Sequence, residues 1–176
     1  MQTEQVILVN EQDEETGTIE KMEAHRKALL HRAFSVFIFN TKGEMLLQQR
    51  AMGKYHSPGL WTNTCCSHPR PGEEVEEAAV RRLKEEMGIE TTLTKIFDFI
   101  YRTEFDNGLT EFEFDHVYTG TYNGQLHPNK QEVNDYCFRP MEDIAQDLER
   151  RSEKYSSWFK IAFPLLSSKL RTSMED

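Results

Sequence analysis

Residues 74–88, EVEEAAVRRLKEEMG, form the clearest helical pattern in the sequence. At about 100° per residue, Val75, Ala78 and Ala79 share one apolar face. Gly88 follows the last turn, where glycine commonly ends a helix. The pattern predicts a helix over 74–87 that packs one face on a hydrophobic core.

Two charged residues fall on the apolar face of this helix. Arg82 and Glu86 lie on the same side as Val75, while Arg81 and Lys84 point away. Because burial of an isolated charge is costly, Arg82 and Glu86 must pair or serve a site. An ordinary ion pair between positions i and i+4 on a half-exposed helix is the simpler interpretation. The helix alone does not choose between the two.

The rest of the chain mixes strands and helices. Apolar and β-branched runs predict strands at 5–10, 33–39, 44–50, 92–102, 111–120 and 131–139, with turns at 40–43 and 106–108. Further helices are predicted at 19–26, at 141–150 after Pro140, and at 155–166, and an acidic linker at 11–15. The polar tail from Ser167 is expected to fray. This pattern is typical of one α/β/α layered domain, spanning 1–176, around a mixed sheet.

The loop before the helix, WTNTCCSHP at residues 61–69, carries groups that can do chemistry. It holds two adjacent thiols, Cys65 and Cys66, and an imidazole, His68. Loops between regular elements often carry binding and catalytic residues. A tight surface loop with incidental thiols is the plainer alternative.

Three acidic residues alternate along the strand at 111–120. Glu111, Glu113 and Asp115 share one face, opposite Phe112 and the residues in phase with it. The strand either exposes an acidic face to solvent or lines a cleft that binds cations. The spacing fits both.

Composition narrows the class of protein. The 176 residues are 38% hydrophobic and carry a formal net charge of −9, which argues against nucleic-acid and anionic membrane partners. No apolar run is long enough to span a bilayer, and the first ten residues lack the pattern of a secretory signal. Three cysteines, an odd count, favour a reducing, cytoplasmic location over a disulfide framework.

The helix and its flanks resemble a Nudix box aligned on Gly88. Ser67 stands where that motif begins with glycine, and Arg82 stands where it has a glutamate. Nudix hydrolases use the glutamates of the box to hold Mg²⁺ on a diphosphate. The resemblance implies a Nudix-like α/β/α sandwich, and Arg82 argues against pyrophosphate hydrolysis.

Further residues make the chain similar to type 1 isopentenyl-diphosphate isomerases over nearly its whole length. The similarity rests on residues 62–69, on 79–82 with 86–88, on Glu111 and Glu113, and on the upstream pair His25 and His31. Such isomerases interconvert isopentenyl and dimethylallyl diphosphate in the synthesis of isoprenoid precursors.

The resemblance also implies roles for individual residues. Cys66 and Glu113 match the catalytic pair. The ligands of a first divalent metal, Mn²⁺, Zn²⁺ or Mg²⁺, are matched by His25, His31, His68, Glu111 and Glu113. A Mg²⁺ that also contacts the substrate is matched to Glu86 and the Cys66 carbonyl. The remaining matches are four diphosphate-binding cations and two aromatic residues: Lys21, Arg50, Lys54, Arg82, Tyr101 and Trp158.

Other interpretations stay open at this point. Singly, a histidine such as His25 is more often a surface or capping residue, and Trp158 at helical spacing is more often core. A Nudix pyrophosphohydrolase and a non-catalytic module held together by metal are the rival functions. The sequence does not distinguish a monomer from a homodimer.

Overall fold

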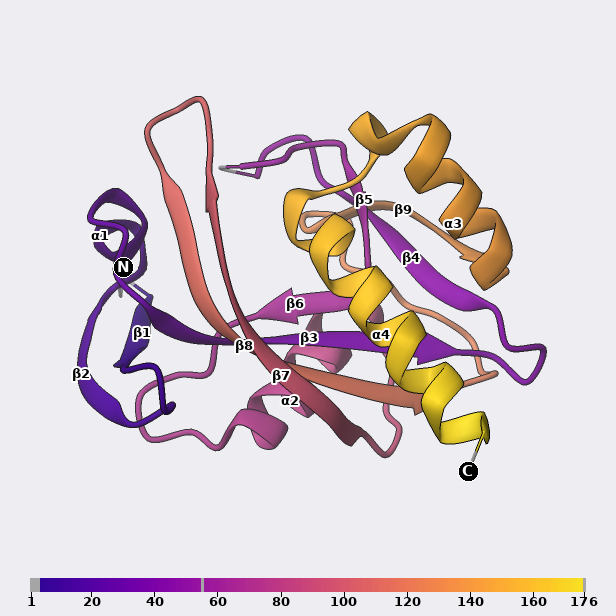
Figure 1. Ribbon diagram of the computed structural model, residues 1–176, viewed down its shortest axis with the longest axis horizontal. Coiled ribbons are helices and arrows are strands. Elements are labelled where there is room, and N and C mark those ends of the chain that lie inside the picture. Colours follow the sequence, from indigo (N-terminus) through magenta and orange to yellow (C-terminus); the bar gives the residue numbers. More distant parts are fainter. Residues whose placement is uncertain (1–3, 55, 176) are drawn as a thin grey trace.

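A computed structural model describes residues 4–54 and 56–175, and its strands form one nine-stranded mixed sheet (Figure 1). The strands are β1 (Gln5–Val9), β2 (Glu15–Glu20), β3 (His31–Phe39), β4 (Met45–Arg50), β5 (Trp61–Thr62), β6 (Cys65–Ser67), β7 (Thr94–Glu104), β8 (Thr110–Thr121) and β9 (Val133–Arg139). The helices are α1 (Lys21–Arg26), α2 (Val75–Met87), α3 (Met141–Arg150) and α4 (Ser157–Glu175), with a 3₁₀ turn at Ser152–Lys154.

Strand β3 lies at the centre of the sheet. The path of the sheet runs β2-β1-β3-β4-β5, and β8 pairs with both β3 and β7. The β3–β8 pair is parallel, while the other described pairs are antiparallel, so the sheet is mixed as predicted. This register sets His31 opposite Glu113 and therefore brings two distant parts of the sequence together.

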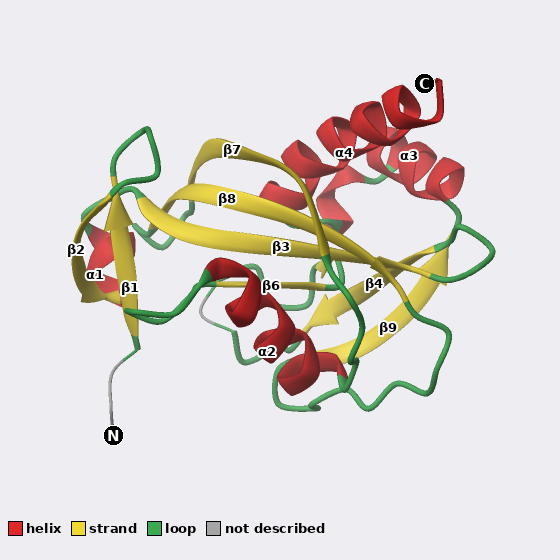
Figure 2. Cartoon of the chain, turned by 90° about the horizontal axis from the view of Figure 1, so that it is seen from below, coloured by secondary structure: helices red, strands yellow, loops and turns green. Residues whose placement is uncertain are grey.

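Helices cover both faces of the sheet, which confirms the predicted α/β/α layering. Figure 2 shows α2 on one side and α3 with α4 on the other. Because side chains alternate along a strand, Phe34, Val36 and Ile38 of β3 pack toward α2, while Phe37 packs toward α4. The Nudix-like sandwich is thus built on two apolar layers around one central strand.

Helix α2 forms where it was predicted, one residue shorter at its start. Ala78 and Ala79 of α2 are completely buried, and Gly88 ends the helix with φ 68°. A Cβ atom at Gly88 would come within 2.6 Å of the Cβ of His127. The position therefore requires glycine for its left-handed backbone and for this close approach.

Three expectations are corrected. Residues 15–20 are strand β2 instead of linker and helix, because they pair with β1 in a hairpin. The loop 61–69 contains two short strands, β5 and β6, held against β4 and β3. Helix α4 does not end at Leu166 but continues to Glu175, and Leu170 extends its apolar stripe over the core. The expected frayed tail from Ser167 is therefore helical as far as Glu175.

Residues 1–3, 55 and 176 of the predicted domain lie outside the described residues. Among the helices described, none combines the length and the apolar character that a membrane crossing needs.

Candidate active site

Buried polar side chains fix the loop that carries the two thiols. The Asn63 amide donates to the carbonyls of Val36 and Cys65, at 3.0 and 2.8 Å. The Thr64 hydroxyl donates to Leu46 O at 2.6 Å and accepts from the Ile38 amide. As a result Cys65 packs into the core against α2, while Cys66, one residue on, lines a cavity.

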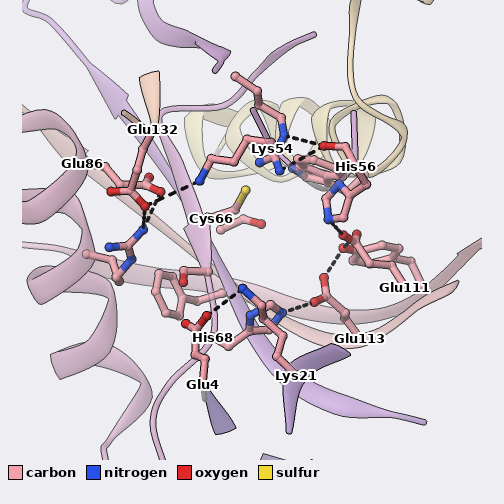
Figure 3. A pocket seen from close by; sticks show the side chains of 17 residues that line it. Glu4, Lys21, Lys54, His56, Cys66, His68, Glu86, Glu111, Glu113 and Glu132 are labelled. Atoms are coloured by element: carbon pink, nitrogen blue, oxygen red, sulfur yellow. Dashed lines mark hydrogen bonds and ion pairs between the residues drawn. The ribbon is translucent and has the colours of Figure 1, made fainter. Parts of the chain in front are cut away.

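This cavity, of about 240 Å³, collects most of the residues predicted from the sequence. Figure 3 shows the Cys66 sulfur between Glu86 on one side and Glu111 with Glu113 on the other. Its lining includes eleven of the predicted residues: Lys21, Arg50, Lys54, Cys66, His68, Arg82, Glu86, Tyr101, Glu111, Glu113 and Trp158. The two remaining predictions, His25 and His31, are completely buried beside Glu113 and His68.

Four of these side chains form a cluster that could hold a metal. The ligating atoms of His25, His31, His68 and Glu113 all lie within 4.8 Å of one another. Glu113 Oε2 is 3.0 Å from His31 Nε2 and 2.5 Å from His68 Nε2. The three histidines come from α1, from β3 and from the loop after β6.

The electrostatics of the cluster suit a cation. Burial and the neighbouring His68 lower the pKa of His25 to about 4, so this imidazole is neutral near pH 7. Burial opposes ionisation of Glu113, but His68 and His31 outweigh it and lower its pKa well below the usual value. Three imidazoles around an ionised carboxylate offer the nitrogen and oxygen donors that transition metals bind, so the residues present fit such an ion.

Backbone carbonyls behind the cluster orient the rings of His25 and His31. His25 Nδ1 lies 2.7 Å from Lys21 O, and His31 Nδ1 lies 2.9 Å from Leu29 O. These contacts leave the Nε2 atoms for the cluster, as in many metal sites. The Tyr101 hydroxyl donates to Glu111 Oε1 at 2.6 Å and contacts Glu113 as well.

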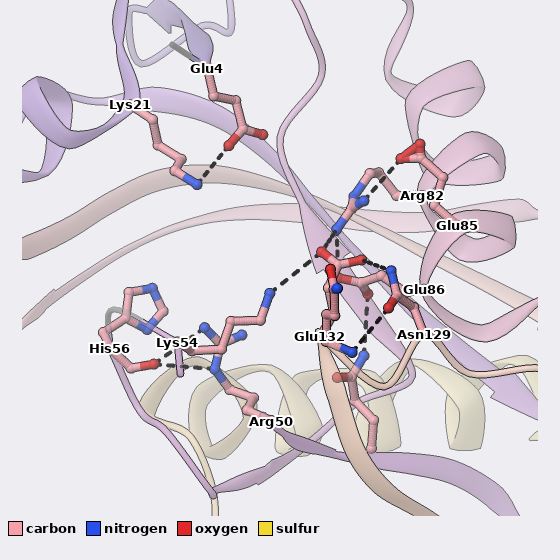
Figure 4. A network of polar contacts seen from close by, with 12 residues as sticks. Glu4, Lys21, Arg50, Lys54, His56, Arg82, Glu85, Glu86, Asn129 and Glu132 are labelled. Atoms are coloured by element: carbon pink, nitrogen blue, oxygen red, sulfur yellow. Dashed lines mark hydrogen bonds and ion pairs between the residues drawn. The ribbon is translucent and has the colours of Figure 1, made fainter. Parts of the chain in front are cut away.

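The opposite end of the cavity is a charged network around Arg82 (Figure 4). Arg82 Nη2 donates to Glu86 Oε1 at 2.8 Å and to Glu132 Oε1 at 2.5 Å, and Nη1 reaches Glu85. Lys54 Nζ lies 3.5 Å from Glu132 Oε1. Burial alone would lower the pKa of Arg82, but the carboxylates of Glu86 and Glu132 have the larger effect and raise this pKa. The guanidinium therefore stays charged.

Arg82 and Glu86 form the ion pair that was one of the two interpretations of the helix. Both side chains also line the cavity. The exposed fraction of the Glu86 side chain is 6%, which fits a site better than a solvated helix face. The acidic face of β8 is likewise buried, since Glu111, Glu113 and Asp115 are each at most 5% exposed. The solvated face is therefore wrong, and Glu111 and Glu113 line the cavity.

Aromatic groups close the cavity between its two ends. The Arg50 guanidinium lies 5.0 Å from the centre of the Trp158 ring. Trp158 is 2% exposed and belongs to α4, so it is both core and cavity wall. Lys21 enters from α1, where Glu4 binds it at 2.6 Å.

Comparison with known proteins decides the family. A model of the NUDIX domain matches residues 29–159. Isopentenyl-diphosphate Delta-isomerase 2 of Aromatoleum aromaticum is 50% identical over 155 residues, which cover 88% of this chain and 82% of that protein. The isopentenyl-diphosphate Delta-isomerase of Pectobacterium atrosepticum is 50% identical over 159 residues, with 90% and 89% covered. The chain belongs to the type 1, Nudix-fold isopentenyl-diphosphate Delta-isomerases.

Solved structures agree on the Nudix fold of this isomerase family member. A Deinococcus radiodurans protein superposes with a TM-score of 0.75 at 20% identity, covering 92% of this chain and 98% of its own. A MutT protein of Methanosarcina mazei Go1 gives 0.66 at 19% identity, covering 80% and 94%. At these identities the likeness is one of fold alone.

Three ionisable residues that line the cavity of this isomerase family member are not among the predicted site residues: Glu4, His56 and Glu132. Each lies on a connection or a chain end whose side-chain direction follows from distant packing. The sequence offers one indication for His56, which is that it lies in the segment 51–58 together with the predicted site residue Lys54.

Proposed function

We propose that this protein interconverts isopentenyl diphosphate and dimethylallyl diphosphate. The observation that carries the proposal is the placement of the Cys66 thiol and the Glu113 carboxylate on the lining of one small cavity with cations at its other end. Family membership supports the same reaction, since the relatives at 50% identity bear that enzyme's name.

The reaction moves a double bond by exchanging two protons. The terminal alkene carbon gains a proton, and the carbon on the other side of the second alkene carbon loses one, so the double bond moves by one position along the chain. The site therefore needs a proton donor and a proton acceptor on opposite sides of a short apolar chain. Cys66 and Glu113 fill these roles, and each donates in one direction of the reaction and accepts in the other.

The surroundings of both groups favour this exchange. Burial raises the pKa of the Cys66 thiol, so the sulfur holds its proton near neutral pH. Glu113 accepts a hydrogen bond from Tyr101, whose own pKa is raised by burial and by Glu111. Tyr101 therefore remains a hydrogen-bond donor that positions the Glu113 carboxylate.

We assign the first metal to His25, His31, His68, Glu111 and Glu113, with Mn²⁺ or Zn²⁺ favoured over Mg²⁺ by the imidazoles. When bound, this ion supplies positive charge that sets the proton affinity of the carboxylate. Glu86, with the Cys66 carbonyl, is assigned to the Mg²⁺ that accompanies the diphosphate.

The diphosphate is assigned to the cationic end of the cavity. Lys21, Arg50, Lys54 and Arg82 supply positive charge that offsets the net charge of −9. Trp158 faces the apolar chain from the wall, and an aromatic face stabilises a developing carbocation by about 2 kcal/mol when water is excluded.

The protein around this site acts as a single domain in the cytoplasm, as a monomer or a homodimer, without nucleic-acid or membrane partners. Free thiols at Cys65, Cys66 and Cys137 support a reducing compartment.

The test is incubation with isopentenyl diphosphate, followed by NMR, with and without EDTA. We expect the dimethylallyl isomer to appear and EDTA to stop its formation. Release of phosphate or pyrophosphate that persists without Cys66 would instead indicate a pyrophosphohydrolase. No turnover at all, with a melting temperature that falls on metal removal, would indicate a binding module.

A further inference from the structure

Strand β7 forms an outer edge of the sheet. Among the described strands it pairs with β8 alone, and Figure 2 shows it along the margin of the sheet with β8 on its inner side. An edge strand presents a row of backbone N–H and C=O groups that can pair with another strand. Within the part of the chain that the structure describes, residues 97–104 make no backbone hydrogen bond beyond the sheet. This edge is therefore open to a further strand.

The two ends of the edge differ in how well they are protected. A β-bulge between Lys95 and Phe97 interrupts the register with β8, and both bulges and lysines discourage pairing at sheet edges. From Phe97 to Glu104 the register with β8 is regular. The segment 97–104 is therefore the part of β7 that can accept a partner strand.

The exposed side chains of this segment are complementary to themselves in charge. Asp98, Ile100 and Arg102 point to one face of β7 because side chains alternate along a strand, and all three are exposed. Charged residues on an edge repel most strands, so a partner must complement them. The order acid, apolar, base becomes base, apolar, acid in the reverse direction. An antiparallel copy of the same strand therefore supplies the charges that this edge requires.

Strand geometry restricts the register of such a pair. A two-fold axis relates the edge to itself, and the backbone groups that point outward belong to every second residue. Residues that face each other must therefore be both even-numbered or both odd-numbered. The register centred on Ile100 meets this condition, and it sets Asp98 opposite Arg102 of the second copy at both ends of the pair.

Neighbouring registers lose this match. A pair centred on Asp98 or on Arg102 sets like charges directly opposite each other, which is destabilising. A pair centred on Tyr101 sets Asp98 opposite Glu104. The charges of β7 therefore favour one register over its neighbours.

The charges of Asp98 and Arg102 have only exposed partners in the single chain. Asp98 Oδ2 lies 2.7 Å from Lys95 Nζ, and Arg102 Nη2 lies 3.4 Å from Glu104 Oε1. Each of these four side chains is at least 40% exposed. Ion pairs in such positions contribute little to stability, so they do not prevent new pairs across strands.

The opposite face of the segment adds apolar contacts. In the register centred on Ile100, Phe99 lies opposite Tyr101 of the second copy, and aromatic pairs across strands are favourable. Helix α4 packs on the face that holds Phe99, so the pairing brings α4 of both copies to one side of the joined sheet. Ile161 and Leu165 stand one turn apart on α4 and are 37% and 42% exposed.

We propose that the protein forms a homodimer through residues 97–103 of β7, paired antiparallel with a second copy about a two-fold axis at Ile100. The two sheets then join into one continuous sheet. The inference selects one of the two oligomeric states named above and gives its surface. It does not depend on the assignment of the catalytic residues.

The test is sedimentation equilibrium of the full chain over a range of protein concentrations. We expect the wild type to form dimers. Asp98→Arg and Arg102→Asp each set like charges opposite each other twice, so each should raise the dissociation constant of the dimer at least about 10-fold. Asp98→Arg combined with Arg102→Asp restores opposite charges with their signs exchanged, and it should restore the dimer.

A second pair of variants tests the centre of the interface. Ile100→Lys sets two lysines opposite each other at the axis and should weaken the dimer at least about 10-fold. Val80→Lys is the matched control, because Val80 is also 40% exposed but lies on α2, and it should leave the dimer unchanged. Circular dichroism checks that every variant is folded.

A wild-type protein that stays monomeric overturns the inference. A dimer that the single charge reversals leave unchanged, or that the combined reversal does not restore, overturns it as well, because such a dimer uses another surface or register. These outcomes leave the proposed isomerisation intact, since product formation tests that reaction separately.

Discussion

At the scale of single residues, Cys65 and Cys66 show how one position along a strand separates structure from chemistry. Cys65 is completely buried in the layer under α2, while Cys66 lines the cavity. Strand alternation in β6 explains the difference, because neighbouring side chains point to opposite faces. Which of the two thiols reaches the cavity thus follows from the pairing of β6 with β3.

Replacing Cys66 with alanine should abolish nearly all isomerisation. The expected loss in kcat is on the order of 10²–10⁴-fold or more, since one of the two proton-transferring groups is gone. The rate is measured by NMR, and circular dichroism checks the fold. Cys137→Ala, a thiol on β9 outside the cavity, is the control and should keep full activity. Wild-type turnover in Cys66→Ala would remove this thiol from the mechanism.

Arg81 and Arg82 are adjacent arginines with different expected contributions to stability. Arg82→Ala leaves Glu86 without its ion-pair partner and Glu132 with Lys54 alone, and it should cost about 3 kcal/mol of unfolding free energy. Arg81 pairs with Glu73 and Glu85 nearer the surface, so Arg81→Ala should cost about 1 kcal/mol or less. Urea unfolding measures both, and equal costs would contradict the burial argument.

At the scale of elements, the end of α2 depends on one glycine. Gly88→Ala combines left-handed strain with a clash against His127 and should cost about 2 kcal/mol or more. Gly108 has a similar φ of 82° but open space around it, so Gly108→Ala should cost only about 1 kcal/mol. Thermal or urea unfolding of the two variants makes the comparison. A smaller loss of unfolding free energy for Gly88→Ala than for Gly108→Ala would show that His127 moves aside at little energetic cost.

Elements with strong local signals were predictable from the sequence. Helix α3 spans 141–150 as expected after Pro140, and α2 was expected one residue longer at its start. Strand β2 was missed because residues 15–20 become a strand only by pairing with β1. The end of α4 was missed because contacts of Leu170 with the core hold its last turns.

At the scale of the whole molecule, the site depends on contacts between distant parts of the chain. The parallel pairing of β3 with β8 sets His31 beside Glu113, and no local pattern in the sequence specifies that register. The resemblance to a family predicts both residues as metal ligands. It does not point to His56 or Glu132, whose positions depend on how the connections before β5 and before β9 fold over the sheet.

Removing the metal should destabilise the folded protein as well as stop turnover. An ion held at 100 times its dissociation constant adds about 2.7 kcal/mol to the unfolding free energy. For a chain of this length, chelation should then lower Tm by roughly 5–10 °C. Calorimetry with and without Zn²⁺ measures the shift. His31→Gln should largely remove it, and a chelator-insensitive Tm in the wild type would contradict the metal assignment.

We propose that Cys66 and Glu113 exchange protons with one carbon chain held between them. The most direct measurement is NMR of isopentenyl diphosphate incubated in D₂O with the wild-type protein, Cys66→Ala and Glu113→Gln. From the wild type we expect dimethylallyl diphosphate that carries solvent deuterium, and from either folded variant we expect almost no isomer. Wild-type rates of isomer formation in either variant, or an isomer free of solvent deuterium, would rule out this proton exchange.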